Sequence, residues 1–218
     1  MNVIFYDKHI IVCEKPAGTV CEGVGESALP TLLARYLADV GEKNTDIFPV
    51  HRLDKETVGV CVFARSSAAA SALSRAITEG TFKKEYLAVV CGIPQKNADT
   101  LTDLLFYDRA RGKSFVVDKQ RAGVKKASLD YQTVSSADGF SLLRVDLHTG
   151  RTHQIRVQFA SRSLPLAGDR RYGAPKNDVT SVCLCAHNLH FPHPSNGKTL
   201  SFSVTPPDSY PWSLFLGR

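Results

Sequence analysis

The segment His51–Gly59, which runs into the apolar segment Val60–Arg65, places the strongest constraint on the fold. A short apolar run bounded by charged and turn residues is typical of a buried strand. Asp54 comes just before this strand, with Arg52 and Lys55 close by in sequence. A neighbouring cation favours the ionised form of a partly buried carboxylate. Such an aspartate is suited to nucleophilic or base chemistry.

The same segment has a second interpretation. An Asp-Lys-Glu-Thr run followed by Gly59 is also typical of a turn, in which the Asp54 side chain accepts hydrogen bonds from backbone N–H groups. Taken alone, the segment leaves both interpretations open.

The remaining apolar runs are arranged mostly as hairpins. They predict strands over residues 3–6, 10–13, 58–64, 84–90, 115–117, 127–134, 140–147, 183–191 and 200–204. Three helices are predicted: one from Pro30 to Gly41, one capped by Ser66 and ended by Gly80, and one capped by Thr152 and ending near Arg162. In the first, Leu32, Leu33, Tyr36, Leu37 and Val40 share the apolar face. This pattern predicts an α+β fold around a mixed, largely antiparallel sheet.

Several bulk features point to a cytoplasmic protein. No apolar run among the 218 residues approaches the length of a membrane helix, and the N-terminus lacks the layout of a signal peptide. The six cysteines are scattered and do not resemble a disulfide framework. Nothing in the sequence suggests an obligate assembly, so we expect a monomer.

The net charge of +6 is concentrated in two segments. The first contains Arg109, Arg111, Lys113, Lys119, Arg121, Lys125 and Lys126; the second contains Arg151, Arg156, Arg162, Arg170 and Arg171. Two basic segments could line one groove for a phosphate backbone, or could be two solvated loops. The motifs Gly150–Val157 and Gly168–Gly173, which fall in the second segment, favour the groove.

Three further motifs accompany the Asp54 segment, in the order Ile11–Gly18, Lys84–Gly92 and Gly150–Val157, the last followed by Gly168–Gly173. Together the four resemble the RluA family of pseudouridine synthases, which isomerise uridine in RNA. The resemblance runs from about residue 9 to about residue 205. Two departures are Val58, where relatives commonly have Ser, and the turn Thr19–Glu22, where a histidine is common.

The resemblance implies one catalytic domain, here residues 1–218, whose sheet is split by a central RNA-binding cleft. Many relatives carry a small RNA-binding (S4) domain before the catalytic domain. Because the Lys-Pro-Ala-Gly motif begins at Lys15, we expect no such domain here. Target choice would then depend on the catalytic domain and its loops.

The resemblance also implies roles for individual residues. Asp54 matches the catalytic aspartate, Arg156 a basic residue that pairs with it, and Tyr86 the active-site tyrosine. An arginine keeps its proton and would hold the aspartate ionised, whereas a tyrosine can stack on an extruded uracil. The alternatives are a surface phosphate contact or helix-face salt bridge for Arg156 and a core position for Tyr86.

Other residues would bind the substrate. Arg52 matches an arginine that fills the space left by a flipped base, with a simple phosphate contact as its alternative. Arg151, Lys125 and Lys126 are expected to contact RNA. Lys15 is expected to be structural or phosphate-facing, and Asp169 to form a structural ion pair rather than to act as a second catalytic carboxylate.

No cofactor motif is present: the sequence lacks a phosphate-binding loop, a dinucleotide fingerprint and a nucleophile elbow. A metal is not expected either, because Cys183, Cys185, His187, His190 and His193 lack the paired spacing of a zinc knuckle. We therefore expect a cofactor-free isomerase acting on ribosomal or transfer RNA. The alternatives are a non-catalytic RNA-binding or RNA-folding protein on the same scaffold and, less favoured, a zinc-dependent binding module.

Overall fold

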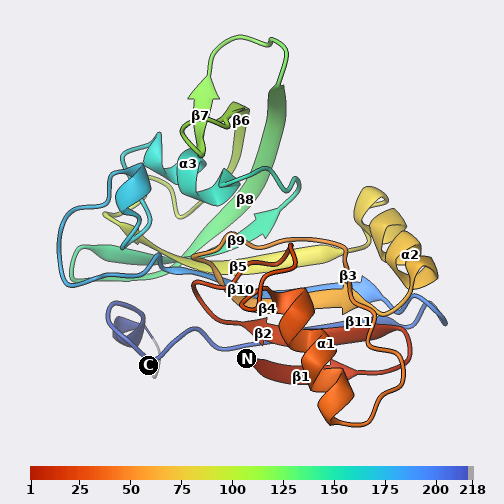
Figure 1. The fold of residues 1–218 in the computed structure, drawn as a ribbon. Coiled ribbons are helices and arrows are strands. Elements are labelled where there is room, and N and C mark those ends of the chain that lie inside the picture. The colour runs from red at the N-terminus through yellow and green to blue at the C-terminus, as the bar shows by residue number, and fades with distance from the viewer. Residues whose placement is uncertain (216–218) are drawn as a thin grey trace. The chain divides into compact units, whose positions relative to one another are not determined.

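The computed structural model describes residues 1–215 (Figure 1). The chain divides into two compact units. Unit 1 comprises Met1–Lys84 and Cys185–Thr205, and unit 2 comprises Glu85–Leu184 and Pro206–Arg218.

Unit 1 is built on a mixed sheet. Its strands are β1 (Asn2–Tyr6), β2 (Ile10–Lys15), β3 (Phe48–Pro49), β4 (Val58–Ala64), β10 (Leu184–Pro192) and β11 (Thr199–Ser203). They follow the order β1-β2-β4-β10, with β3 added on β4 and β11 on β10. Only the pairing of β4 with β10 is parallel; it joins Gly59 to Ala186. The other pairings within this unit are antiparallel.

Two helices pack on the unit 1 sheet. Helix α1 (Leu29–Asp39) lies across β1 and β2 in Figure 1, and α2 (Ser67–Thr78) follows β4. Side chains alternate along a strand, so a buried strand contributes apolar side chains to both faces of the sheet. Leu73 of α2 packs in one cluster with Ile10 and Val12 of β2 and Val60 and Val62 of β4. This packing fixes β4, and therefore the segment that leads into it.

Unit 2 contains an antiparallel sheet in the order β5-β9-β8-β6-β7. Its strands are β5 (Lys83–Cys91), β6 (Ala98–Asp108), β7 (Lys113–Val117), β8 (Val124–Ala137) and β9 (Phe140–Leu147). The helices are α3 (Gln154–Ala160) and the short turns η1 (Arg170–Tyr172) and η2 (Trp212–Leu214). Val157 of α3 packs against Leu105 of β6 and Ala127 of β8, so α3 is anchored on this sheet.

The predicted α+β class with a mixed, largely antiparallel sheet is confirmed. Strands β4 and β9 have the predicted bounds. The Ser66 hydroxyl caps α2 by accepting from the Ala69 N–H, as predicted. The single domain and the cleft that splits the sheet stay predictions.

Two local predictions were wrong, and one strand was missed. Thr152 does not cap α3. The N-cap residue is His153, which has a left-handed φ of 54° and makes no side-chain capping hydrogen bond. Val40 is 45% exposed, because α1 ends before it. Strand β6 was not predicted, since only Leu101 and Leu105 along its eleven residues are buried.

Among the helices of residues 1–215, none has both the length and the apolar character needed to cross a bilayer.

Candidate active site

Asp54 lies in the loop that enters β4. It is half-buried, and its carbonyl accepts a hydrogen bond from the Thr57 N–H at 3.1 Å, which closes a tight turn over Lys55 and Glu56. The Gly18 N–H donates to the Lys55 carbonyl at 2.8 Å. The motif that ends at Gly18 therefore helps to hold this turn in place, although it is distant in sequence.

Lys15 stabilises the same turn through hydrogen bonds to its backbone. Its side chain is fully buried, and its ammonium donates to the carbonyls of Pro16 (3.0 Å), Lys55 (3.0 Å) and Thr57 (2.7 Å). Burial lowers the pKa of Lys15, and nearby acidic groups, Asp54 among them, oppose that shift. Of the two roles expected for Lys15, these contacts support the structural one: the side chain holds the backbone on the C-terminal side of Asp54 in place.

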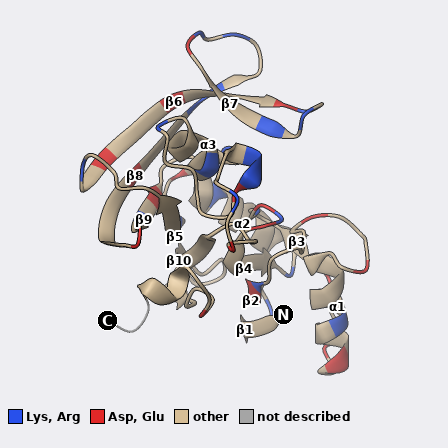
Figure 2. Cartoon of the chain, turned by 90° about the vertical axis from the view of Figure 1, so that its left-hand side faces the viewer, with Lys and Arg blue, Asp and Glu red and all other residues tan. Residues whose placement is uncertain are grey.

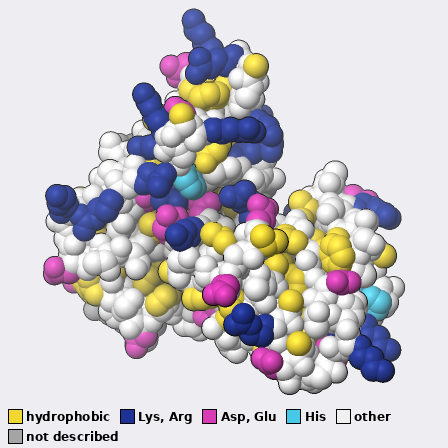
Figure 3. All heavy atoms as spheres, in the orientation of Figure 1, with side chains coloured by type: hydrophobic (Ala, Val, Ile, Leu, Met, Phe, Trp, Pro, Cys, Tyr) yellow, Lys and Arg dark blue, Asp and Glu magenta, His cyan; other side chains and the backbone are white. Residues whose placement is uncertain are grey.

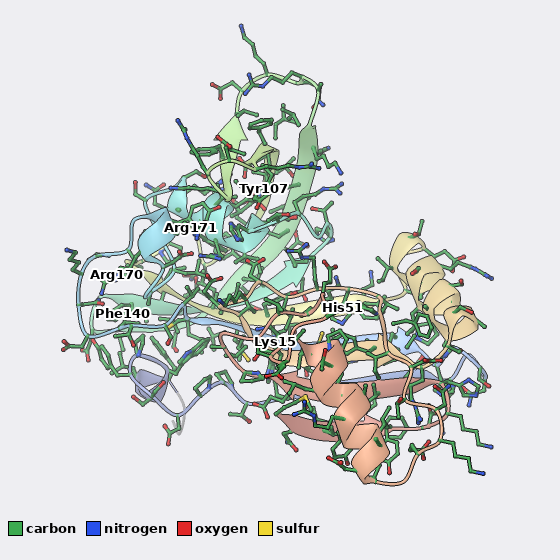
Figure 4. The ribbon with its side chains drawn as sticks, viewed as in Figure 1. Lys15, His51, Tyr107, Phe140, Arg170 and Arg171 are labelled. Atoms are coloured by element: carbon green, nitrogen blue, oxygen red, sulfur yellow. The ribbon has the colours of Figure 1, made fainter. Side chains whose placement is uncertain are left out.

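The two residues before Leu53 differ in their surroundings. The Arg52 side chain is 61% exposed and lies 3.5 Å from the carboxylate of Glu22, a loose surface pair. His51 is buried, and its Nε2 accepts from the Val62 N–H at 3.1 Å (labelled in Figure 4). Burial lowers the pKa of His51 well below its usual value, so the ring is neutral. Arg52 is accessible to a ligand, whereas His51 fastens the loop to β4.

Arg156 belongs to the core of unit 2. Only 2% of its surface is exposed, and its guanidinium donates twice to Asp169, from Nε to Oδ2 at 2.6 Å and from Nη2 to Oδ1 at 2.9 Å. Asp169 is fully buried. A bidentate pair fixes the guanidinium in position and orientation. Asp169 does form the expected structural ion pair, and its partner is Arg156 rather than an adjacent arginine.

Tyr172 completes the surroundings of Arg156. The guanidinium lies 5.2 Å from the centre of the Tyr172 ring, and the phenol oxygen accepts from the Ser114 N–H at 2.8 Å and lies 2.9 Å from His153 Nδ1. Burial raises the pKa of Tyr172 to about 12, so the phenol keeps its proton. Helix α3, η1 and β7 are thus tied together around one buried arginine.

Tyr86 lies on β5, opposite Val145 of β9, and is 5% exposed. Asp54 belongs to unit 1, whereas Tyr86 and Arg156 belong to unit 2. The predicted meeting of these three residues therefore stays a prediction.

The two basic segments both lie in unit 2, and the structure brings them together. Arg151 Nε donates to the carbonyl of Lys126 at 3.1 Å, and Arg171 Nη1 donates to the carbonyl of Gly112 at 2.7 Å. Figure 2 shows Lys and Arg around β7 and α3, and Figure 3 shows them gathered on the surface over this part of unit 2. We call the exposed residues Arg109, Arg111, Lys119, Arg121, Lys125, Lys126, Arg151, Arg170 and Arg171 the basic surface.

Aromatic rings orient part of this basic surface. The guanidinium of Arg121 lies 4.9 Å from the ring centre of Phe106, and that of Arg111 lies 6.0 Å from that of Phe115. Such contacts hold a cation over a ring without neutralising it. Arg111 also forms a long ion pair, with its Nε 3.6 Å from Asp108 Oδ2, but its side chain stays 73% exposed. In contrast, Arg162 forms a two-pronged salt bridge with Asp103, and Arg156 is buried. Both lie outside the basic surface.

No cluster of three or more His, Cys, Asp or Glu side chains suited to a metal ion occurs within residues 1–215. In the segment that raised the question of zinc, the His187 ring is bonded to the carbonyl of Val204 and the His193 ring to Asp7. These histidines serve as structural links.

Three parts of this arrangement were missed at the level of sequence. They are the partnership of Asp169 with Arg156, the phenol of Tyr172 beneath it, and a thiol pair formed by Cys21 and Cys61 under the Asp54 loop. The motif Gly168–Gly173 forms a tight turn, in which the Tyr172 N–H donates to the Asp169 carbonyl at 3.0 Å. Its link to Arg156 could not be read from local sequence.

Several known proteins similar in sequence to this chain carry the name of a pseudouridine synthase. A sequence model described as RNA pseudouridylate synthase matches residues 9–161. An uncharacterized RNA pseudouridine synthase of Aquifex aeolicus is 34% identical, over 96% of this chain and 71% of its own length. Ribosomal large subunit pseudouridine synthase D of Neisseria meningitidis is 35% identical, over 95% of this chain and 59% of its own length. The chain thus spans between about three fifths and seven tenths of these relatives.

Solved structures share the fold. Human RNA Pseudouridylate Synthase Domain Containing 4 superposes with a TM-score of 0.81 at 23% identity, covering 98% of this chain and 91% of that one. Human RNA Pseudouridylate Synthase Domain Containing 1 gives a TM-score of 0.78 at 22% identity, covering 95% and 83%. The matched residues 9–161 include the Asp54 loop, β5 and α3. This chain belongs to the RNA pseudouridylate synthase family.

Proposed function

We propose that this chain isomerises uridine to pseudouridine in a structured RNA, without a cofactor. The observation that carries the proposal is the family match over residues 9–161, which spans Asp54, Tyr86 and Arg156. The reaction breaks the glycosidic C–N bond, turns the uracil and rejoins it through carbon. It has no net redox change, so one ionised carboxylate and a site that holds the detached base are sufficient.

Asp54 is the reacting carboxylate in this proposal. Its support is the rigid turn around it, because Lys15 and Gly18 both bind the carbonyl of Lys55, the next residue. A carboxylate fixed in this way loses little orientational freedom when a nucleoside arrives. Arg156, whose orientation Asp169 fixes, steadies the carboxylate, and Tyr86 stacks on the uracil. The approach of Asp54 to Arg156 and Tyr86 is part of the proposal.

The uridine must leave its stack to reach Asp54, at a cost of about a few kcal/mol. Arg52 is suited to fill the vacated space, because its side chain is 61% exposed and its contact with Glu22 is long. It stands two residues before Asp54, so a side chain inserted into the RNA would stay close to the reacting group.

The basic surface binds the RNA backbone in this proposal. Arg151, Lys125 and Lys126 are exposed, and the bond from Arg151 to the Lys126 carbonyl supports a shared role. Adjacent cations that retain their charge attract phosphates and release counterions on binding. Ribosomal RNA is the first substrate class to test, given the names of several relatives, and transfer RNA is the second. We further propose that the chain acts as a monomer in the cytoplasm, where its six unbridged cysteines would persist.

Replacing Asp54 by Asn tests the proposal. The amide keeps the size of the side chain and removes the reacting charge, so pseudouridine formation should stop while RNA affinity is largely kept. Pseudouridine is mapped across total RNA from cells with and without the gene, and then in the RNA thus identified, using purified enzyme.

Asp39→Asn is the matched control, because Asp39 is exposed at the end of α1. It should keep the wild-type rate. If Asp54→Asn also kept that rate, the catalytic assignment would be wrong. If the wild-type protein bound RNA but left no pseudouridine at any position, the non-catalytic RNA-binding alternative would be favoured.

A further inference from the structure

Two thiols meet beneath the Asp54 loop of unit 1. Cys21 comes from the turn after Gly18 and Cys61 from the middle of β4, and their sulfur atoms are 4.0 Å apart. Both are buried, with 3% and 0% of their surfaces exposed. The pair stands 40 residues apart in sequence, so the fold alone brings it together.

The two sulfur atoms differ in their hydrogen bonds. Cys21 Sγ accepts from the Leu53 N–H at 3.3 Å, and Cys61 lies within reach to donate as well. Cys61 Sγ lies 3.7 Å from His51 Nε2, which already accepts the Val62 N–H and so acts as an acceptor. The single lone pair of Nε2 is thus occupied, so the one S–H proton of Cys61 is left to donate to Cys21, and negative charge is favoured on Cys21.

The charges around the pair act in the same direction. The hydrogen bonds from Cys61 and from the Leu53 N–H, helped by Lys15 and Arg52, outweigh burial and lower the pKa of Cys21 to about 7. The bond to Cys21 and burial raise the pKa of Cys61 well above its usual value. A low-pKa thiol beside a second thiol is the arrangement of redox-sensing pairs, in which one sulfur attacks and the other resolves.

The other cysteines lack these features. Burial raises the pKa of Cys13, Cys183 and Cys185 to about 12 and also raises that of Cys91. Cys13 is the informative comparison, because it faces Cys61 across the β2–β4 ladder. Cys13 and Cys61 are directly opposite each other on the two strands. Among the described residues, however, no backbone N–H donates to the sulfur of Cys13 as the Leu53 N–H donates to that of Cys21.

We propose that Cys21 and Cys61 form a peroxide-responsive thiol pair that closes to a disulfide and thereby disturbs the Asp54 loop. The Cys21 thiolate attacks one peroxide oxygen, the O–O bond breaks, and hydroxide leaves with the proton that Cys21 had released, as water. The Cys61 thiol then attacks the sulfenic sulfur of Cys21. The S–O bond breaks, and the hydroxyl leaves with the Cys61 proton as a second water.

Access to Cys21 requires only a small local movement. Residues 22–27, which follow it, are all exposed, and Val24 is 97% exposed. Hydrogen peroxide is close to water in size, so displacement of this exposed segment is enough to admit it. Cys61 is held in the middle of β4, where it pairs with Cys13 of β2, which makes Cys21 the sulfur that moves.

Closing the bond would affect the reaction proposed above, on which this part of the inference rests. The sulfur atoms must approach from 4.0 Å to about 2.05 Å. That shift draws Cys21 away from the Leu53 N–H, the backbone group just before Asp54. Because a misplacement of about 1 Å at a reacting group can cost about a hundredfold in rate, we expect the isomerisation rate to fall about tenfold or more.

The test treats the whole protein with hydrogen peroxide under native conditions. We expect loss of two of the six thiols, a peptide cross-link between Cys21 and Cys61, and restoration by dithiothreitol. Cys21→Ala should abolish the cross-link, whereas Cys13→Ala should keep it. Cys21 lies on a loop, so its variant should fold even if a variant of Cys61 does not.

Activity is measured on the same samples. Wild-type and Cys13→Ala should lose isomerisation on oxidation, and Cys21→Ala should resist. No cross-link, or one between Cys13 and Cys61, would overturn the thiol pair. A Cys21–Cys61 cross-link with unchanged activity would overturn its effect on the loop. A reduced protein with no activity would instead contradict the proposed function, and the thiol mapping would remain readable.

Discussion

Gly59 should be among the least replaceable residues of the chain. It pairs with Ala186 where β4 and β10 run parallel, and its φ is +123°. A Cβ added there would lie 2.3 Å from the carbonyl oxygen of Ala186 and 2.5 Å from its nitrogen. Real Cβ atoms essentially never come closer than 3.0 Å to another heavy atom, so one strand must move by about 0.7 Å or more.

The cost of Gly59→Ala follows from these distances. Neither strand can yield easily, because Val60 and Ala186 are buried with at most 1% of their surfaces exposed. The variant therefore combines backbone strain, of about 1–3 kcal/mol, with disrupted strand pairing and core packing. We expect it to lose more than about 4 kcal/mol of unfolding free energy.

Gly80→Ala is the matched control for this variant. Gly80 also has a positive φ, of +71°, but no atom lies within 4 Å of its added Cβ. It should lose only the left-handed penalty of about 1–2 kcal/mol. In a chain of this size, each kcal/mol lowers the Tm by about 2–4 °C. The measurements are the Tm and the urea midpoint of both variants. If Gly59→Ala unfolded at the same midpoint as Gly80→Ala, the steric argument would be refuted.

Three further predictions concern charged side chains. Lys15→Met should lose about 3 kcal/mol or more in urea unfolding, because the buried carbonyl of Thr57 and the partly buried carbonyls of Pro16 and Lys55 lose a charged donor; unchanged stability would show that these bonds are dispensable. Replacing Lys125 and Lys126 by Ala should weaken RNA binding and flatten its salt dependence, with the slope of log affinity against log salt falling by about 2; an unchanged slope would remove them from the interface. For Asp7, burial alone would raise the pKa, but bonds from two backbone N–H groups and from His193 outweigh it, so the pKa is lowered from 3.8. Its stabilisation is present above that value and is lost as pH falls below it, so the urea midpoints of wild type and Asp7→Asn should differ at neutral pH and converge in acid; a constant difference would contradict this linkage.

Local sequence was sufficient for much of the framework. The apolar run Val58–Ala64 and the turn residues on either side specify β4, and Ser66 specifies the start of α2. Asp138 and Gly139 both adopt positive φ, which is what the hairpin between β8 and β9 requires. These features are local: each depends on a side chain acting on its own or an adjacent backbone segment.

Strand β6 was missed because its pattern carries little local information. Of its eleven residues only Leu101 and Leu105 are buried, and the three residues between them are exposed or half-buried. Its regular structure comes from pairing with β8 over nine residue pairs and with β7 beyond. A strand stabilised mainly by its neighbours is recognised only once those neighbours are in place.

The amino-acid sequence by itself determined the family, the α+β class and the identity of the candidate residues Asp54, Tyr86 and Arg156. Only the tertiary structure decided their supports: Asp169 holds Arg156 from 13 residues away, and Lys15 holds the Asp54 turn from about 40. It also brought Cys21 to Cys61. The physical reason is that motifs record the side chains that perform chemistry, whereas the orientation and charge of those side chains depend on groups that only the folded chain brings within hydrogen-bonding distance.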